Sequence, residues 1–332
     1  MNDIARAVPA TLLLATCNLL NLARPGRRFY DNQEPFSPDE YTRKIDWLGA
    51  QIRRLGADVI AFQEVWDEAA LRDAVAASGL RYAHLAAPGA EQGAEGTPRL
   101  GIASRWPLRE LTSHRDFAAA QHVAVPDLGE QRAFERPVLE ALIDMPGERG
   151  TMRVLVVHLK SKRPKFLQDE AGEPLEDRDD AGVQARATLR ALTIRAAEAT
   201  ALRVLVHARL AQTREPLVLM GDLNDGPHAV TTQIVAATHS VAYDRAARDT
   251  ALFHALDVQS DATIRRDVAY SHLYQGWPEV LDQIWVSEEF VATSRFAVGG
   301  VRRVEYFNDH LQEGRDRTRS DHGFVRALVM LN

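Results

Sequence analysis

The stretch Pro216-Leu-Val-Leu-Met-Gly-Asp-Leu-Asn-Asp-Gly-Pro227 constrains the fold of this chain more than any other. Its apolar run, 217–220, has the length and composition of a strand that is buried on both faces. Such a strand can place a carboxylate only at its end. Asp222 and Asn224 are therefore predicted to lie at a strand tip, where proteins often carry functional residues. The alternative is an ordinary polar turn, since Asp, Asn and Gly supply turn geometry in any protein.

Other apolar runs are followed directly by polar residues in the same way. They are 11–16 with Asn18, 57–62 with Gln63 and Glu64, and 152–157 with His158. Side chains alternate across a strand, so Cys17 and Asn18 should face opposite ways, and only one of them can enter a site. We expect Cys17 to pack as a small buried hydrophobe.

Helices are predicted between several of these strands. Ser37-Pro-Asp-Glu40 has the pattern of a capping box with proline at the first helical position, and this helix should end near Gly56. A second helix should begin near Asp67. The stretch 183–210 is rich in Ala, Arg and Leu and free of Pro and Gly, which predicts a long helix.

Strands follow one another without helices in the middle of the chain, which predicts antiparallel hairpins. These strands are 99–104, 136–143 and 152–157. Later strands are expected at 279–286, 301–306 and 323–329. Asp282 lies inside an apolar alternation, where a carboxylate is costly unless it is paired.

The 332 residues show no linker or break in composition, so we expect a single domain over 1–332 with its core in 11–330. The segment 160–181 is a charged loop, basic at first and then acidic, and its acidic half is predicted to be solvated and mobile. The net charge of −6 argues against binding nucleic acid by overall charge, although a local basic groove remains compatible with it.

The compartment is predicted from cysteine usage and from the absence of membrane signals. Cys17 is the single cysteine, which excludes an internal disulfide and a cysteine-rich zinc site and favours a reducing compartment. No segment has the roughly 20 apolar residues of a spanning helix. The start, Met1–Arg6, is not typical of a signal peptide. We therefore expect a cytoplasmic protein without stable membrane insertion.

Six polar motifs in a fixed order resemble those of the endonuclease/exonuclease/phosphatase superfamily. The motifs are Asn18, Gln63-Glu64, His158, Gly221-Asp-Leu-Asn224, Leu281-Asp-Gln-Ile284 and Ser320-Asp-His322. The resemblance spans residues 12–329 and implies a four-layer α/β sandwich, in which two mixed β-sheets flanked by helices carry a metal site along one edge. Each motif alone is weak evidence, but their common order is specific.

A metal-dependent phosphoesterase also makes chemical sense of the residue types. Phosphate ester hydrolysis needs a cation, a group that handles water, and donors to the phosphate. Carboxylates and carboxamides without cysteine suit a hard ion, so Mg²⁺ or Mn²⁺ is expected. Glu64 is the obvious first ligand. By resemblance, Asn18 and Asp321 complete or support the metal shell.

The resemblance also implies the catalytic roles. Asp222 would orient or deprotonate the attacking water, and Asn224 would hold that water or a phosphate oxygen. His322 would donate to the phosphate, while Asp282 would orient its imidazole and favour the charged form. An aspartate beside a strand can also simply bond a loop.

Two further residues match catalytic positions of the family, and each also has a purely structural interpretation. His158 resembles the histidine that protonates the leaving oxygen, and the alternative is a satisfied core histidine. Arg136 matches an arginine that contacts the phosphate, and the alternative is a surface salt bridge.

Departures from the family patterns narrow the substrate. Leu20 stands where apurinic endonucleases usually have an aspartate, and the signature blocks of the inositol phosphatases are missing around 224–227 and 276–282. A sphingomyelinase would carry an exported start and an exposed aromatic finger, and neither is identifiable in the sequence. What remains resembles bacterial nuclease-like members.

The predicted function is therefore hydrolysis of phosphodiester bonds in DNA or RNA by in-line attack of water. A phosphomonoesterase, or a phospholipase or sphingomyelinase-like enzyme, is the alternative within the same chemistry. A catalytically inactive binding module is the alternative outside it. The expected partner is nucleic acid or another phosphodiester substrate, and no protein partner is predicted.

Overall fold

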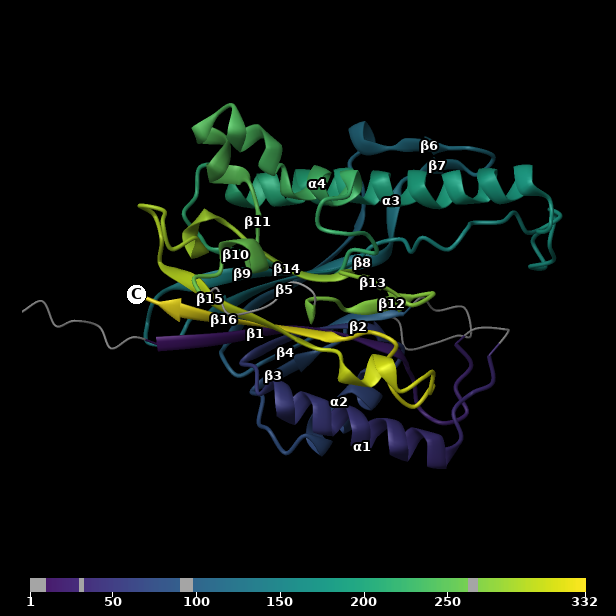
Figure 1. Cartoon of the computed structure of the whole chain (residues 1–332), viewed down its shortest axis with the longest axis horizontal. Coiled ribbons are helices and arrows are strands. Elements are labelled where there is room, and N and C mark those ends of the chain that lie inside the picture. The colour runs from purple at the N-terminus through teal and green to yellow at the C-terminus, as the bar shows by residue number, and fades with distance from the viewer. Residues whose placement is uncertain (1–9, 30–32, 90–97, 262–267) are drawn as a thin grey trace, which may run out of the picture.

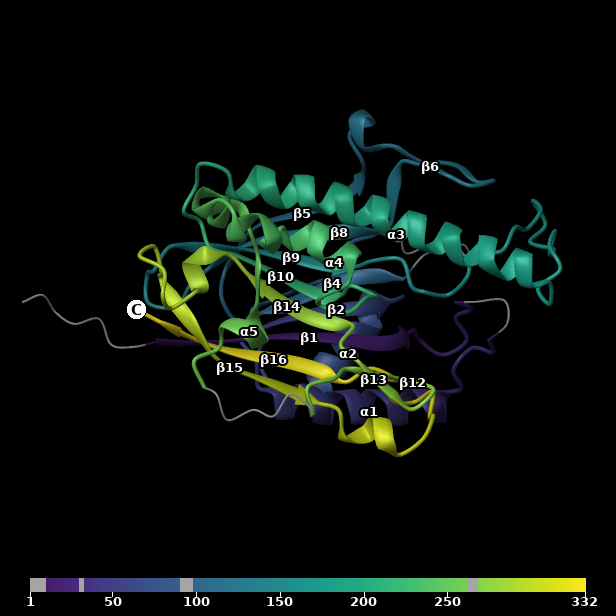
Figure 2. The ribbon, with the colours of Figure 1, turned by 45° about the horizontal axis from the view of Figure 1, so that its top comes forward.

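The strands of this chain form two six-stranded sheets that pack face to face, and helices cover both outer faces (Figure 1, Figure 2). The structure is a computed structural model that describes residues 10–29, 33–89, 98–261 and 268–332. Both sheets are mixed, since each contains one parallel pair among antiparallel ones. The predicted four-layer α/β sandwich is confirmed.

The first sheet has the strand order β15-β16-β1-β2-β4-β3. Its strands are β15 (Gly299–Phe307), β16 (Phe324–Leu331), β1 (Ala10–Leu22), β2 (Val59–Val65), β4 (Arg99–Ser104) and β3 (His84–Ala86). β1 and β2 are parallel, whereas β16 runs antiparallel to β1. The carboxyl ends of β1 and β2 and the start of β16 therefore lie at one edge.

The second sheet has the order β11-β14-β10-β9-β8-β5. Its strands are β11 (Phe253–His254), β14 (Asp282–Val286), β10 (Leu217–Asp222), β9 (Thr151–His158), β8 (Ala133–Asp144) and β5 (Leu108–Asp116). β9 and β10 are parallel, and β14 runs antiparallel to β10. The carboxyl ends of β9 and β10 and the start of β14 therefore lie at one edge of this sheet.

Helices begin and end where the capping residues predict. In α1 (Pro38–Leu55), the Ser37 hydroxyl accepts a hydrogen bond from the amide of Glu40, and Gly56 closes the helix in the left-handed conformation with φ of 58°. Together with α2 (Glu68–Ala77), it packs on the first sheet. The long α3 (Ala181–Leu210) and the short α4 (Val230–Ala236) pack on the second. A further short helix is α5 (Ala255–Val258).

Alternation along β1 divides its side chains between two cores. Leu12 and Leu14 are buried against residues of the second sheet, such as Val154 and Val156 of β9. Cys17 lies on the other face, fully buried among residues of α1 and α2, and Asn18 points the opposite way. The prediction that only one of this pair enters a site is confirmed.

Several strand boundaries differ from those predicted. β1 continues to Leu22 and β2 to Val65, so the polar residues expected after these strands lie inside them. The strand expected at 279–286 is two strands, because β13 (Trp277–Glu279) leaves the sheet and pairs with β12 (His272–Tyr274). A second small hairpin, β6 (Val123–Val125) with β7 (Gly129–Gln131), was also not predicted.

The charged loop before α3 is fastened at its acidic end. Glu176 accepts hydrogen bonds from the buried Arg190 of α3, with Oε2 2.8 Å from Nη1, and from the amide of Leu167. In the basic half, Lys160 is only 7% exposed. The other acidic residues of this half are exposed, as predicted, and Glu176 is the exception because the buried Arg190 needs a carboxylate partner.

Among the described residues, no helix combines the length and the apolar character that crossing a bilayer requires. The prediction about Met1–Arg6 concerns residues outside the described ranges.

Glu140 of β8 links the second sheet to α3 through several charged hydrogen bonds. Its carboxylate accepts from Arg153 of β9, from Arg209 of α3 at 2.7 Å, and from His114 of β5 at 2.6 Å. Burial alone would raise the pKa of this carboxyl, but the hydrogen bonds from His114, Arg209 and Arg153 lower it to about 2.

We predict that Glu140→Gln lowers the free energy of unfolding at pH 7 by roughly 2 kcal/mol. Because the folded pKa is below the unfolded value of 4.5, this stabilisation is present above pH 4.5 and is lost as pH falls toward 2. Urea unfolding at pH 7 and pH 3 measures both effects. Glu110→Gln, at an exposed position of β5, is the control. Equal urea midpoints for Glu140→Gln and the parent at pH 7 would contradict the prediction.

Candidate active site

The polar ends of the strands meet at the edge that the two sheets share. The first sheet supplies Asn18 and Glu64 from β1 and β2, and His322 two residues before β16. The second supplies Asp222 and His158, which are cross-strand neighbours at the ends of β10 and β9. Asp282, the first residue of β14, lies opposite Asp222 on its other side.

Glycine at position 221 allows β10 to lie close to β9 at this edge. The backbone of Gly221 has φ of 151°, and a Cβ atom there would be 2.0 Å from the carbonyl oxygen of Val157. No other residue fits this approach. The tight turn that follows is held by Asp222, whose Oδ1 accepts from the amide of Asn224 at 2.8 Å.

Asp222 lies at the centre of the site and is 1% exposed. Its Oδ2 accepts a hydrogen bond from Nδ2 of Asn18 at 3.1 Å and lies 3.4 Å from Nε2 of His158. Nε2 of His322 is 3.9 Å from the same oxygen. Burial, followed by the negative charge of Asp282, raises the pKa of Asp222 to about 7.

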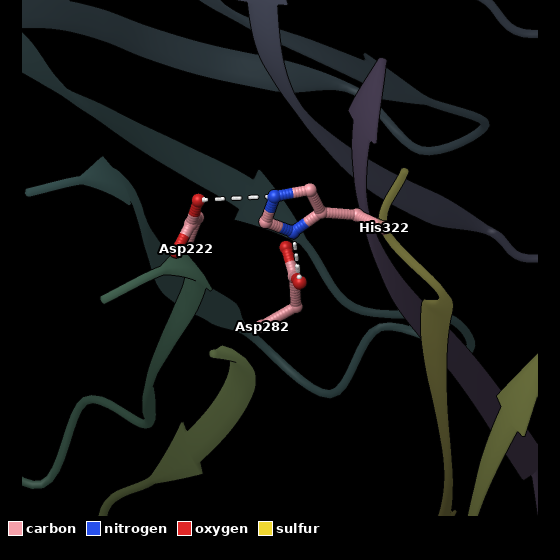
Figure 3. A group of neighbouring side chains, drawn as sticks. All are labelled: Asp222, Asp282 and His322. Atoms are coloured by element: carbon pink, nitrogen blue, oxygen red, sulfur yellow. Dashed lines mark hydrogen bonds and ion pairs between the residues drawn. The ribbon is translucent and has the colours of Figure 1, made fainter. Parts of the chain in front are cut away.

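Asp282 and His322 form a buried hydrogen-bonded pair, drawn with Asp222 in Figure 3. The distance from Nδ1 of His322 to Oδ2 of Asp282 is 2.7 Å. Burial disfavours the charged imidazole, but the charge of Asp282 and this hydrogen bond outweigh it and raise the pKa of His322 well above its usual value. His322 is therefore a cation at neutral pH.

The backbone at two strand ends is bent so that side chains enter the site. Glu64 has φ of 60°, and the pairing of β2 with β4 shifts register around it. Leu20 and Asn21 have φ of 50° and 54°, where β1 shifts register against β2. Bulges of this kind re-aim side chains and are common beside active sites. They place the Glu64 carboxylate between the amide of Asn21, at 3.0 Å, and Nδ2 of Asn18, at 3.4 Å.

The donors around Glu64 fit a hard divalent cation. Glu64 is partly exposed to the site, and its pKa is raised by burial and then by the charge of Asp321. Two carboxylates that repel each other are stabilised by a cation with oxygen ligands. Asn18 directs its amide nitrogen to Glu64 and Asp222, and its side-chain oxygen accepts from the amide of Leu20 at 3.1 Å.

Asp222, Asp282 and His322 also offer one ligand atom each within 4.8 Å of one another. Within this group, Nδ1 of His322 is already bonded to Oδ2 of Asp282 at 2.7 Å, so the ring has only Nε2 left to offer a ligand.

Arg136 and His158 contact each other through the backbone. Nε of Arg136 donates to the carbonyl of His158 at 2.9 Å, and Nη2 donates to the carbonyl of Leu159 at 2.7 Å. Nδ2 of Asn224 donates to the same Leu159 carbonyl at 2.9 Å. Burial, followed by the positive charge of Arg136, lowers the pKa of His158 well below its usual value. These donors therefore hold the end of β9, and His158 is neutral.

Two serines to which the sequence analysis assigned no role position the site. Ser320 donates to the carbonyl of Asn18 at 2.6 Å and accepts from the amide of His322 at 3.0 Å. The Ser271 hydroxyl accepts from the amides of Leu281 and Asp282, at 3.0 and 2.9 Å. The position of Ser320, two residues before His322, could have indicated its role. Ser271 is separated from Asp282 by the β12–β13 hairpin, which was not predicted, so its role could not be recognised.

Lys44 of α1 is a further support that was not predicted. It is completely buried, and its ammonium donates to the carbonyls of Arg317 and Arg319 at 3.1 and 3.4 Å. Burial lowers the pKa of Lys44 to about 7, while the charges of Glu64 and Asp321 oppose this shift. Lys44 thus holds the segment that leads into Asp321.

A cavity of about 420 Å³ lies beside these residues. It is bordered by Asp321, Ser320, Asn21 and Arg315, and by His272 of β12. The ring of His272 lies 5.1 Å from that of His322, centroid to centroid. His310 also borders the cavity, and its Nε2 lies 2.9 Å from the carbonyl oxygen of His322. Neither His272 nor His310 was assigned a role from the sequence.

Comparisons with known proteins identify the family of the chain. Residues 15–322 match the profile of the Endonuclease/Exonuclease/phosphatase family, and the chain belongs to that family. No curated protein sequence matches the chain. Family membership and the buried acidic and histidine cluster place the protein among phosphoester hydrolases, which in this family generally depend on a divalent metal.

Solved structures show the same fold at low sequence identity. A family protein from Bacteroides thetaiotaomicron has a TM-score of 0.59 at 14% identity, over 98% of this chain and 96% of that one. The catalytic domain of human nocturnin with a bound sulfate anion has a TM-score of 0.56 at 15% identity, over 97% of this chain and 95% of that one. A mannosyl-6-phosphatase from Bacteroides thetaiotaomicron has a TM-score of 0.54 at 12% identity, over 96% of this chain and 99% of that one.

We predict that Asp282→Asn lowers the pKa of His322, because the substitution removes the charge and the acceptor that keep the imidazole protonated. In the parent the ring should stay charged through neutral pH, and in the variant it should lose its proton at lower pH. Histidine side-chain NMR of metal-free protein measures this titration. Asp116→Asn, an equal charge change at an exposed position, should leave it unaltered. An unshifted His322 titration in Asp282→Asn would show that the pair is not coupled.

Proposed function

We propose that the protein is a metal-dependent phosphodiesterase that cleaves nucleic acid by in-line attack of water. The observation that carries this proposal is the position of Asp222, buried between a neutral histidine and the cationic His322, with Glu64 across the site. A base, a cationic donor and a carboxylate pair for a metal are the parts that this hydrolysis needs.

Each part has a role in the proposed reaction. A divalent cation, Mg²⁺ or Mn²⁺, held by Glu64 and Asp321, would neutralise the charge on the phosphate oxygens. With a pKa of about 7, Asp222 is partly ionised at neutral pH and accepts the proton of the attacking water. As the oxygen of that water bonds to phosphorus, the bond to the leaving oxygen breaks on the opposite side, and the departing alkoxide takes a proton from solvent while Asp222 returns its own to solvent. His322 donates to a nonbridging oxygen of the phosphate.

The role of His158 changes from the one expected. A general acid needs a pKa near or above the working pH, and that of His158 is lowered. We therefore assign His158 a neutral hydrogen bond to the phosphate or the leaving oxygen. Arg136 donates two hydrogen bonds to backbone carbonyls and so positions β9. Only its remaining N–H groups can contact a phosphate.

A phosphomonoesterase that acts on a small molecule is the second candidate. The cavity of about 420 Å³ beside His272 and Asp321 is large enough for a small phosphate ester, and one structure with this fold is a mannosyl-6-phosphatase. An inactive binding module is disfavoured, because every predicted catalytic residue is present. We place the reaction in the cytoplasm, where a protein with one buried free cysteine fits the reducing conditions.

We predict that Glu64→Gln and Asp222→Asn each reduce kcat on bis-p-nitrophenyl phosphate by about 100-fold or more, because each removes a charge at the reacting centre. Parent activity should require Mg²⁺ or Mn²⁺ and vanish in EDTA. Glu110→Gln and Asp116→Asn are the matched controls at exposed positions. If p-nitrophenyl phosphate is cut and no phosphodiester is, the phosphomonoesterase is correct. If the variants match the parent, the site is wrongly placed.

We predict that His322→Ala also loses activity while the protein remains folded, because the side chain acts at the phosphate. Circular dichroism and the thermal midpoint monitor the fold, and the same assay measures kcat. A collapse of the fold with full activity in the folded fraction would instead make Asp282 and His322 a structural pair.

A further inference from the structure

A small hairpin carries two exposed aromatic residues close to the candidate active site, and its strands are labelled β12 and β13 in Figure 1. Its strands are β12 and β13, joined by Gln275 and Gly276, whose φ values are 49° and 85°. Tyr274 and Trp277 are directly opposite each other, so their side chains share one face. They are 57% and 75% exposed. The expectation that the chain has no exposed aromatic finger is therefore wrong; the strands are too short to be recognised in the sequence.

The base of this hairpin is bonded to the catalytic residues. Ser271 accepts from the amide of Asp282 through its hydroxyl, at 2.9 Å, and from the amide of Gly323 through its carbonyl, at 2.6 Å. His272, the next residue, lies against the ring of His322. Tyr274 is two residues further, a path of about 7 Å along a strand. The aromatic pair is thus anchored to the strand ends that carry Asp282 and His322.

The charges around the hairpin suit a polyanion. Glu279 is the single charged residue in 268–281, and it is neutralised by Nζ of Lys162 at 2.5 Å. Arg163, next to that lysine, and Arg315, which borders the cavity, are exposed. Within the described part of the chain, neither guanidinium forms an ion pair. Single-stranded nucleic acid binds sites that combine exposed cations with aromatic side chains.

We propose that Tyr274 and Trp277 form a stacking platform for an unpaired nucleobase next to the scissile phosphodiester. The platform rests on the proposed function and narrows its substrate to single-stranded nucleic acid, since the bases of a duplex are stacked on each other. A lipid surface is the less suitable occupant. The tip between the two aromatic residues is the polar Gln275-Gly276, and 268–281 contains none of the lysines or arginines that interfacial segments use beside their apolar residues.

The test compares two oligonucleotides of equal length, one with normal bases and one built of abasic sites. The double variant Tyr274→Ala/Trp277→Ala should raise KM about 10-fold on the normal strand. It should leave the abasic strand and bis-p-nitrophenyl phosphate within about 2-fold of the parent, because neither offers a base to stack. Tyr243→Ala, at a 90% exposed tyrosine after α4, is the matched control. It should leave KM unchanged for all three substrates.

Fluorescence anisotropy in EDTA measures binding separately from cleavage. The parent should bind the normal strand more tightly than the abasic strand, and the double variant should lose that preference. Equal binding of both strands by the parent would overturn the platform even if cleavage is normal. If the parent hydrolyses no nucleic acid but keeps the preference, the proposed function fails and the platform stands. Loss of binding to phosphatidylcholine vesicles in the double variant, with unchanged oligonucleotide kinetics, would assign the hairpin to lipid and overturn the proposal.

Discussion

The hydrogen bond from Asn18 to Asp222 joins the two sheets at the edge where the site lies. Asn18 belongs to β1 of the first sheet and Asp222 to β10 of the second, and both side chains are buried. The pair of His322 and Asp282 spans the same boundary. Each half of the site is therefore incomplete by itself. The face-to-face packing of the apolar sheet surfaces, which supplies most of the burial, also sets the distances between catalytic groups.

Much of the fold follows from local sequence patterns. Apolar runs, the capping box at Ser37 and the long run without Gly or Pro locate the principal strands and helices, because burial and capping act over a few residues. The small hairpins and the anchoring of Glu176 by Arg190 depend on partners distant in sequence. No periodicity of three-residue strands distinguishes them from turns, so they could not be predicted.

The residues that gather at the candidate site could be predicted, but their protonation states could not. Polar residues that close apolar runs pointed to Asp222, Glu64 and His158, which lie within the last two residues of β10, β2 and β9. Their protonation depends on which charges lie nearby in three dimensions. Arg136 lowers the pKa of His158, whereas Asp282 raises that of His322. One histidine of the site is thus driven toward the neutral form and the other toward the charged form.

The left-handed backbone of Glu64 has a consequence for stability. A residue with a Cβ atom at φ of 60° is conformationally unfavourable, and here the same residue also brings a carboxylate close to Asp321. Both features oppose folding, and both serve the placement of one oxygen pair. Position 64 is therefore one where the placement of a carboxylate conflicts with backbone preference and charge repulsion, and the hydrogen bonds from Asn21 and Asn18 oppose that conflict.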